Sequence, residues 1–247
     1  MLQSYEIFLY LCNMEWKIVH IGETDSTNRW LREQGGEEEV VVWTDYQTAG
    51  RGCGANTWES ERGSNLLFSV LLHPVDIPVR EQFRISMAVS VALCEMLSCY
   101  ADGFAIKWPN DIYWCDYKIC GMLIENHVQG DCIRDSIVGV GLNVNQKQFR
   151  SNAPNPISLS QIVGHDFDRE QLLHEFLEHF ENILGRETLA ADYESLLYRL
   201  ETLTEYADAK GRFEAVLNRV EADGRLVLTD KAGKKRIYAF KEVKFII

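Results

Sequence analysis

Apolar residues along the chain fall into short strand-like runs separated by polar, turn-forming segments. The runs that predict strands, rich in β-branched and aromatic residues, are 16–21, 40–43, 66–72, 104–108, 118–125 and 135–144. Turns at 115–117 and 129–131 join the last three of these predicted strands. The stretch 50–64 lies between two predicted strands and is rich in glycine, so we expect it to be a loop.

Helical segments alternate with these strands. Cap residues precede two of the predicted helices: Asp25-Ser26-Thr27-Asn28 stands before the first and Asp168 before the third. Between residues 80 and 100 apolar side chains occur on nearly every face, which predicts a helix buried at the centre of a layered domain. Asp168 has Gln171 at the third following position, as in a capping box. A last helix is predicted for 188–206.

After residue 210 the pattern changes to short alternating runs with turns at Asp223-Gly224 and Ala232-Gly233. Short strands of this kind over 211–247 predict a small β-barrel. We therefore expect an α+β fold in two domains. Residues 1–206 would form a mixed, largely antiparallel sheet packed with helices, and residues 207–247 a small all-β domain.

The charge of the chain narrows the choice of partners. Lys and Arg number 25 against 37 Asp and Glu, which gives a formal net charge of −12 over 247 residues. Duplex DNA and acidic membranes bind concentrated positive faces, so neither is an expected partner. A small basic pocket for a small anion remains compatible with this composition.

Cysteine usage and the N-terminus bear on the compartment. The seven cysteines are odd in number and no two are spaced as C-x-x-C, so we expect reduced thiols and a cytoplasmic location. The segment 1–15 carries an apolar run, but it lacks a basic region and a cleavage site and is too short to span a bilayer. We interpret it as an N-terminal extension, and a natural start at Met14 stays open.

The most informative loop is Gly50-Arg51-Gly52-Cys53-Gly54-Ala55-Asn56-Thr57-Trp58. Its glycines would let backbone N–H groups approach a phosphate closely, and Arg51 would offer a charged fork to the same oxygens. Trp58 at the end of the loop could stack on an adenine ring. A plain glycine-rich turn is the alternative, since the spacing matches neither a Walker loop nor a Rossmann fingerprint.

A second polar segment, Lys107-Trp108-Pro109-Asn110-Asp111, is followed by Lys118-Ile119-Cys120-Gly121-Met122-Leu123-Ile124-Glu125. We expect a hairpin that places Lys118 beside Asn110 and Asp111. An exposed turn with a surface salt bridge is the competing interpretation. Gly121 would let the sheet bend or let a ligand lie against the backbone.

Together these segments resemble the biotin protein ligase family, in its single-function form without an N-terminal DNA-binding domain. The family has a Gly-Arg-Gly loop, a Lys-Trp-Pro-Asn-Asp segment and a Lys-x-x-Gly-x-Leu-x-Glu strand in this order. The resemblance extends over about residues 16 to 185 and includes further matching segments, which are 25–28, 46–49, 139–143 and 158–159. It implies a class II synthetase-like catalytic domain and a C-terminal SH3-like β-barrel.

The resemblance also implies which residues bind biotin and ATP. Ser26, Thr27 and Gln47 would bind the ureido ring of biotin, while Gly121, Gly139 and Gly141 would leave space along its wall. Arg51 would contact the biotin carboxylate and the AMP phosphate, and Trp58 would pack on adenine. The implied set of binding residues is Ser26, Thr27, Asn28, Gln47, Gly50, Arg51, Gly52, Cys53, Trp58, Lys107, Asn110, Lys118, Gly121, Gly139, Gly141 and Asn143.

By the same resemblance the reaction has two steps. Lys118 would stabilise the charge while the biotin carboxylate attacks the α-phosphorus of ATP to give biotinyl-5'-AMP. A lysine of a biotin carboxyl carrier protein would then attack the anhydride, with Asp111 a candidate to assist proton loss. Mg²⁺, with unknown ligands, would neutralise the pyrophosphate, and Asn110, Asp111 and Asn143 would orient Lys118. A homodimer stays open.

The match departs from the family at Cys53, where many members carry a second loop arginine. The loss of that charge predicts weaker retention of biotinyl-AMP. Only about 15 residues precede the first predicted strand, so a DNA-binding domain is not expected. Two rivals stay open: a lipoate ligase, against which the polar set Ser26, Thr27 and Gln47 argues, and a non-catalytic sensor, against which Arg51 and Lys118 argue.

Overall fold

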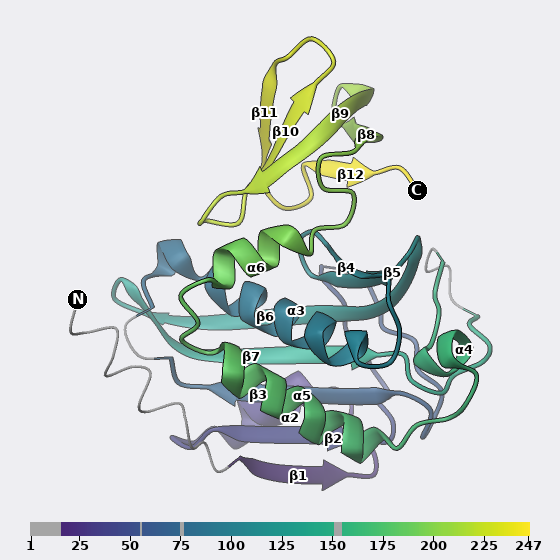
Figure 1. The fold of residues 1–247 in the computed structure, drawn as a ribbon. Coiled ribbons are helices and arrows are strands. Elements are labelled where there is room, and N and C mark those ends of the chain that lie inside the picture. Colours follow the sequence, from purple (N-terminus) through teal and green to yellow (C-terminus); the bar gives the residue numbers. More distant parts are fainter. Residues whose placement is uncertain (1–15, 55, 75–76, 151–154) are drawn as a thin grey trace.

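The computed structural model describes residues 16–54, 56–74, 77–150 and 155–247, which form two lobes (Figure 1). The larger lobe is built on a seven-stranded sheet with the order β1-β2-β3-β7-β6-β5-β4. Its strands are β1 (Lys17–Ile21), β2 (Val40–Thr44), β3 (Leu66–Leu72), β4 (Phe104–Lys107), β5 (Asp111–Trp114), β6 (Tyr117–Gln129) and β7 (Cys132–Leu142). β1 and β2 are parallel and the other pairs are antiparallel, which confirms the predicted mixed, largely antiparallel sheet.

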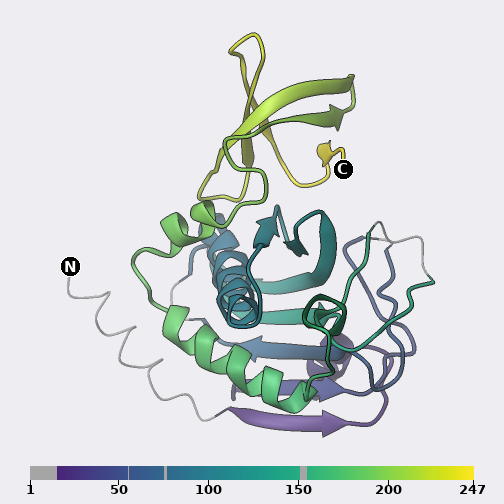
Figure 2. The ribbon, with the colours of Figure 1, turned by 45° about the vertical axis from the view of Figure 1, so that its right-hand side comes forward.

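Helices cover both faces of this sheet. They are α2 (Thr27–Gln34), α3 (Phe83–Ser98), α4 (Leu159–Val163), α5 (Arg169–Ile183) and α6 (Leu189–Ser195), with the 3-10 turn η1 (Val79–Glu81). α3 and α5 lie on one face and α2 on the other (Figures 1 and 2). Every residue of β3 is buried: Phe68 packs in the main core, while Leu71 packs with Leu31 of α2 in a smaller cluster. Alternate side chains of this central strand thus serve both layers.

The smaller lobe is a five-stranded antiparallel sheet with the order β11-β10-β9-β8-β12. Its strands are β8 (Leu203–Asp208), β9 (Gly211–Val220), β10 (Leu226–Asp230), β11 (Lys235–Tyr238) and β12 (Val243–Phe245). The predicted turns occur at Gly224 and Gly233, with φ of 87° and 78°, which glycine adopts without strain. Among the described residues no strand pairing closes this sheet into the expected barrel. Because β8 begins at Leu203, the expected boundary at 206 falls inside a strand.

The β9–β10 turn of the second lobe makes close contacts with the first lobe. Trp108 Nε1 donates a hydrogen bond of 2.8 Å to the carbonyl of Gly224 in the β9–β10 turn. A Cβ on Gly224 would lie 2.7 Å from the ring of Phe83, at the start of α3. The turn therefore needs glycine both for its positive φ and for its contact with the first lobe.

The predicted helix over 188–206 is wrong in its second half. α6 ends at Ser195, and Leu197 pairs as an isolated bridge with Ile106 of β4. Arg199 and Glu201 then adopt left-handed backbone, with φ of 60° and 54°. Pairing of the linker with the sheet edge therefore overrides the local helix propensity.

Two short elements were missed by the sequence analysis. β5 was assigned to no element, because its four residues begin with the polar Asp111. α4 begins at a capping box made by Ser158 and Gln161, and Gly164 ends it with a φ of 94°. In contrast, the predicted cap of α5 is confirmed, since Asp168 accepts a hydrogen bond from the backbone N–H of Gln171.

Further predictions concerned the cysteines, the N-terminal segment and a membrane span. The six cysteines in the described part of the chain are all free thiols. The N-terminal extension at 1–15, which contains Cys12, lies outside the described residues. In the part of the chain that is described, no helix has both the length and the apolar character needed to cross a bilayer.

Candidate functional site

A cavity of about 610 Å³ opens between the sheet, the glycine loop 50–58 and the second lobe. All of the predicted site residues line it except Gly50 and Asn143. The sequence analysis missed other lining residues, which are Asn56, Thr57, Trp108, Pro109, Met122, Leu123, Val140, Phe240, Lys241, Val243, Lys244 and Phe245. The last five come from the second lobe, and no local motif in the sequence indicated that this lobe reaches the cavity.

One end of the cavity is polar and buried. Gln47 Oε1 accepts hydrogen bonds from the backbone N–H and the hydroxyl of Thr27, at 2.8 and 3.2 Å. Ser26, only 5% exposed, is the N-cap of α2, but its side chain makes no capping hydrogen bond. No described residue accepts a hydrogen bond from Gln47 Nε2. These unused groups can bind a polar ring that has both donors and acceptors.

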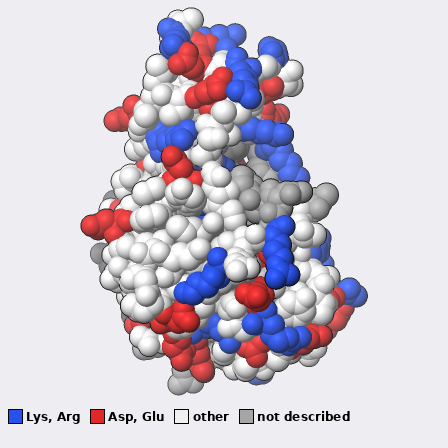
Figure 3. Space-filling model, turned by 90° about the vertical axis from the view of Figure 1, so that its right-hand side faces the viewer, with Lys and Arg blue, Asp and Glu red and all other residues white. Residues whose placement is uncertain are grey.

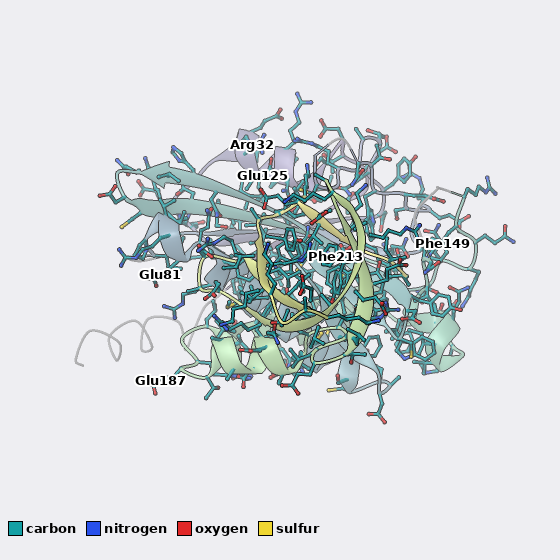
Figure 4. The ribbon with its side chains drawn as sticks, turned by 90° about the horizontal axis from the view of Figure 1, so that it is seen from above. Arg32, Glu81, Glu125, Phe149, Glu187 and Phe213 are labelled. Atoms are coloured by element: carbon teal, nitrogen blue, oxygen red, sulfur yellow. The ribbon has the colours of Figure 1, made fainter. Side chains whose placement is uncertain are left out.

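Asn28 borders this polar end and is fixed on several sides. Its Oδ1 accepts a hydrogen bond of 2.6 Å from Ser69, and its Nδ2 donates to Leu123 O and Glu125 Oε2, at 3.2 and 2.9 Å. Arg32 forms an ion pair of 2.6 Å with Glu125, and the two side chains lie next to each other in Figure 4. Asn28 is therefore held as a rigid wall of the cavity.

Three glycines on β6 and β7 form the floor of the cavity. Gly121 pairs directly with Gly141, and Gly139 lies two residues along the same strand. A Cβ on Gly139 would lie 2.1 Å from Asn28 Oδ1, and one on Gly141 would lie 2.4 Å from the indole of Trp58. The indole of Trp58 lies against Gly141 and Gly121, and the amide of Asn28 lies against Gly139, so these glycines let flat groups approach the strand backbone closely.

The glycine loop folds back on itself above this floor. Gly52 N donates to Asn56 O at 2.8 Å, and Trp58 N donates to Gly50 O at 3.0 Å. A Cβ on Gly50 would lie 2.7 Å from Trp58 O, so Gly50 sits behind the loop rather than on the cavity wall. The half-exposed Arg51 points to Glu125, with 3.7 Å between Nη1 and Oε1.

Lys118 and Asp111 form the central ion pair, with 2.6 Å between Nζ and Oδ1. They come from the paired strands β5 and β6, whose register shifts so that Ile119 is an extra residue. A bulge of this kind turns the strand by one residue, so Lys118 and Gly121 share one face despite their spacing of three. Accordingly, a Cβ on Gly121 would lie 3.2 Å from Lys118 Nζ.

The backbone of Lys118 is clamped from outside the sheet. Its N–H donates to Asn155 O at 2.7 Å, and its carbonyl accepts from Ile157 N at 3.0 Å. Asn143 braces the clamp: its backbone N–H donates to Ile119 O at 2.9 Å and its Nδ2 donates to Ile157 O at 3.1 Å. Asn143 therefore acts on the backbone around Lys118 rather than on its amine.

Asn110, which was also expected to orient Lys118, contacts the backbone of β6 at Met122. Its Nδ2 donates a hydrogen bond of 2.5 Å to Met122 O, and its carbonyl accepts from Met122 N at 2.9 Å. It therefore fixes the segment after Pro109 against β6. Of the three residues expected to orient Lys118, only Asp111 contacts the amine in the structure.

Lys107, at the end of β4, is partly buried. Burial lowers the pKa of Lys107 below its ordinary value, although the nearby Asp111 carboxylate opposes that effect. Its amine lies 5.0 Å from the ring centre of Tyr113 and 5.2 Å from that of Phe245. Aromatic faces partly compensate a buried cation, so Lys107 can remain charged beside the cavity.

Metal-binding groups are sparse around this cavity. Within the described ranges, no three His, Cys, Asp or Glu side chains are placed to hold a metal ion. In the described part of the chain one carboxylate lines the cavity, that of Asp111, and it is already paired with Lys118. The described residues therefore do not fit a metal bound by the protein alone.

Comparison with known proteins gives consistent results. Residues 21–143 match the model of the biotin/lipoate A/B protein ligase family. The chain is 30% identical over 231 residues to the bifunctional ligase/repressor BirA of Bacillus spizizenii, covering 89% of this chain and 70% of the relative. It is 27% identical to the biotin–[acetyl-CoA-carboxylase] ligase of Paracoccus denitrificans, covering 89% and 97%.

A solved structure agrees in fold over nearly the whole chain. The biotin protein ligase from Aquifex aeolicus, in complex with biotin and ATP, superimposes with a TM-score of 0.74 at 26% identity. The match covers 93% of this chain and 99% of that one, so both lobes have a counterpart.

Proposed function

The chain belongs to the biotin/lipoate A/B protein ligase family, and we propose that it is a biotin protein ligase that uses ATP. It activates biotin as biotinyl-5'-AMP with release of pyrophosphate, and then transfers the biotin to a lysine of a biotin carboxyl carrier protein. Ligases of this name and a ligase structure that holds biotin and ATP are among the similar proteins.

The observation that carries this proposal is the combination of three groups in one cavity. A polar set made of the buried Ser26 and Thr27 and the partly exposed Gln47 lies at one end. A glycine floor crosses β7 and β6, and Lys118 follows on β6. This arrangement suits a ligand with a polar ring, an extended chain and a terminal carboxylate. Biotin has these three parts in this order.

In the first step, a carboxylate oxygen of biotin bonds to the α-phosphorus of ATP, and the bond from phosphorus to the bridging oxygen breaks. Lys118 lies where it can stabilise the negative charge of the carboxylate and the phosphate, and Asp111 holds its amine in place. Arg51 adds a second positive charge from the glycine loop. Trp58 is proposed to stack on the adenine.

In the second step, a neutral lysine amine of the carrier protein bonds to the acyl carbon of biotinyl-AMP, and AMP leaves. The amine loses one proton in this step. Among the described residues Asp111 is the one carboxylate that lines the cavity, so it is the candidate to receive this proton. The other residues that line the cavity hold the anhydride and exclude water from it.

Magnesium is proposed to enter with ATP, bound to its phosphates. The described residues lack a group of side chains that could hold the ion on their own. ATP phosphates and water supply most of its ligands in such sites.

A transfer assay that compares biotin with lipoate tests the proposal. The intact protein, ATP and magnesium are incubated with a purified biotin carrier domain and labelled biotin, and in parallel with a lipoyl domain and labelled lipoate. We expect label only in the biotin carrier domain, because the polar set at Gln47 pairs with a ureido ring. Label in the lipoyl domain alone would make the chain a lipoate ligase. Biotin binding without any transfer would make it a sensor.

The cytoplasmic location and the absence of DNA binding stay predictions from the sequence, and a homodimer stays open. The division into domains at about residue 206 also stays a proposal, and the start of β8 at Leu203 places the second sheet slightly earlier.

A further inference from the structure

The order of strands gives the order of groups along the cavity. The polar set follows β1 and β2, the glycine floor lies on β7 and β6, and Lys107 ends β4 at the far edge of the sheet. The second lobe stands over this far edge, next to β4 and β5 (Figure 1). A biotin that starts at Gln47 and ends at Lys118 therefore leaves the far edge of the cavity for part of ATP.

Two lysines of the second lobe, Lys241 and Lys244, line the cavity. Lys241 lies in the turn between β11 and β12, where Glu242 N donates to Ala239 O at 3.2 Å and Ala239 N donates to Glu242 Oε2 at 2.8 Å. Lys241 itself adopts left-handed backbone, with a φ of 70°. The braced turn thus directs its side chain toward the first lobe.

The amine of Lys241 reaches the glycine loop. A Cβ on Gly54 would lie 2.4 Å from Lys241 Nζ, so the amine occupies the space that a side chain at position 54 would fill. The neighbouring residue is Cys53, where the family resemblance led us to expect a second arginine. A cation from the second lobe therefore stands beside the position at which the loop lacks one.

The charge of the cavity is strongly positive although the whole chain has a net charge of −12. The charged side chains that line it are Arg51, Lys107, Lys118, Lys241, Lys244 and Asp111. Neither Lys241 nor Lys244 forms an ion pair with any residue in the described ranges. Lys and Arg side chains gather at the base of the second lobe, where it meets the first (Figure 3). Such a concentration of uncompensated cations attracts a multiply charged anion.

We propose that Lys241 and Lys244 bind the β- and γ-phosphates of ATP and hold the pyrophosphate as it leaves. This inference rests on the proposed ligase function. When the bond between the α-phosphorus and the bridging oxygen breaks, the electron pair stays on pyrophosphate. The two amines neutralise part of that charge. The second lobe thereby contributes directly to the activation step and supplies the charge absent at Cys53.

An acidic surface of the carrier protein is the other anionic partner that these lysines could meet. The phosphate chain fits better, because Lys241 Nζ touches the inner glycine loop and both lysines line the cavity. The two partners act in different steps, so kinetics separate them. Phosphate contacts affect activation by ATP, while carrier contacts affect transfer from preformed biotinyl-AMP.

The experiment compares the intact protein with the double variant Lys241→Ala/Lys244→Ala. A matched control, Lys234→Ala/Lys235→Ala, removes the same charge from the β10–β11 turn of the same lobe, away from the cavity. Binding of inorganic pyrophosphate with magnesium is measured by calorimetry. KM values for ATP and biotin, and the transfer rate from purified biotinyl-AMP, are measured alongside.

We expect the double variant to weaken pyrophosphate binding and to raise the KM for ATP at least about tenfold, as for the loss of charged hydrogen bonds. The KM for biotin and the transfer rate should stay within about twofold, and the control should match the intact protein. Unchanged pyrophosphate binding, or a loss confined to the carrier step, would overturn the proposal. The intact protein could form no biotinyl-AMP while the double variant still binds pyrophosphate more weakly than the intact protein. That result would contradict the ligase function but would support the anion-binding site.

Discussion

Asp111 and Lys118 face each other across β5 and β6, with 2.6 Å between Oδ1 and Nζ and with less than a quarter of either side chain exposed. The pair exists because the bulge at Ile119 turns Lys118 to the cavity face. An amine held by one carboxylate keeps hydrogen-bond donors for a ligand. The pair therefore positions a charge without fully neutralising it.

Replacing the carboxylate tests this positioning role. In Asp111→Asn the amide still accepts a hydrogen bond, but it no longer attracts the amine as a charge. We expect kcat for biotinyl-AMP formation to fall about tenfold, which corresponds to about 1.4 kcal/mol. The KM for ATP should not rise, because the cavity becomes more positive. Asp131→Asn, in the β6–β7 turn, is the control, and equal rates for both variants would refute the role of Asp111.

A methyl group on the glycine floor should damage the biotin end of the cavity. The Cβ of Gly139→Ala would lie 2.1 Å from Asn28 Oδ1, and Asn28 cannot move freely because Ser69, Leu123 and Glu125 hold it. We expect the KM for biotin to rise at least about tenfold and the stability to fall by about 1–3 kcal/mol.

The matched control for that variant is Gly22→Ala, because a Cβ at Gly22 would meet nothing within 4 Å. Biotin kinetics and thermal unfolding of both variants can be measured side by side. If Gly139→Ala binds biotin as tightly as the intact protein does, the floor is not in contact with biotin.

The charge of Lys107 should lower the stability of the folded protein while it improves binding of ATP. Lys107→Met keeps most of the packing against Tyr113 and Phe245 but removes a charge that burial disfavours. We expect thermal unfolding at neutral pH to occur at an equal or higher temperature, while the KM for ATP rises.

The pH dependence of Lys107 follows from its lowered pKa. The penalty for burying the charge is complete below the lowered pKa of the folded protein and disappears as the pH rises to the ordinary lysine value of about 10.4. The stability advantage of Lys107→Met should shrink over that range. An unfolding temperature clearly below that of the exposed control Lys235→Met would contradict this account.

A hydrogen-bonded cluster between the β5–β6 turn and the segment after α6 should respond to acid. Asp116, two residues before Lys118, accepts hydrogen bonds from Tyr198 and from Arg199, the latter at 3.1 Å. The hydrogen bond from Tyr198 and the charge of Arg199 lower the pKa of Asp116 below its ordinary value. Burial opposes them with a smaller effect than that of the Tyr198 hydrogen bond. The stabilising effect of Asp116 is therefore present above the ordinary value of about 3.9 and is lost as the pH falls through the lowered pKa.

Asp116→Asn should then lower stability at pH 7 by up to about 1 kcal/mol, since the carboxylate is mostly exposed. The intact protein and the variant should converge in stability as the pH falls through the lowered pKa of Asp116. Denaturant unfolding at several pH values measures both. If the difference in unfolding free energy between the two proteins stays constant across the pH range, the charge of Asp116 does not stabilise this cluster.

Sequence patterns predicted much of the first lobe, since its strands are apolar and its turns carry glycine or cap residues. They predicted Lys118 and Gly121 as site residues by resemblance, but a spacing of three in a regular strand places side chains on opposite faces. The bulge at Ile119 resolves this, and it depends on the register with β5, a long-range pairing. The end of α6 and the role of Lys241 also depend on contacts between distant segments.

Transfer of labelled biotin to a purified biotin carrier domain, with the intact protein and with Lys118→Ala, tests the central claim most directly. We predict that the intact protein labels the carrier and that the variant does so about 10²- to 10³-fold more slowly, as for loss of one preorganised charge stabiliser. Equal labelling by both would contradict the role of Lys118. No labelling by the intact protein would contradict the ligase function itself.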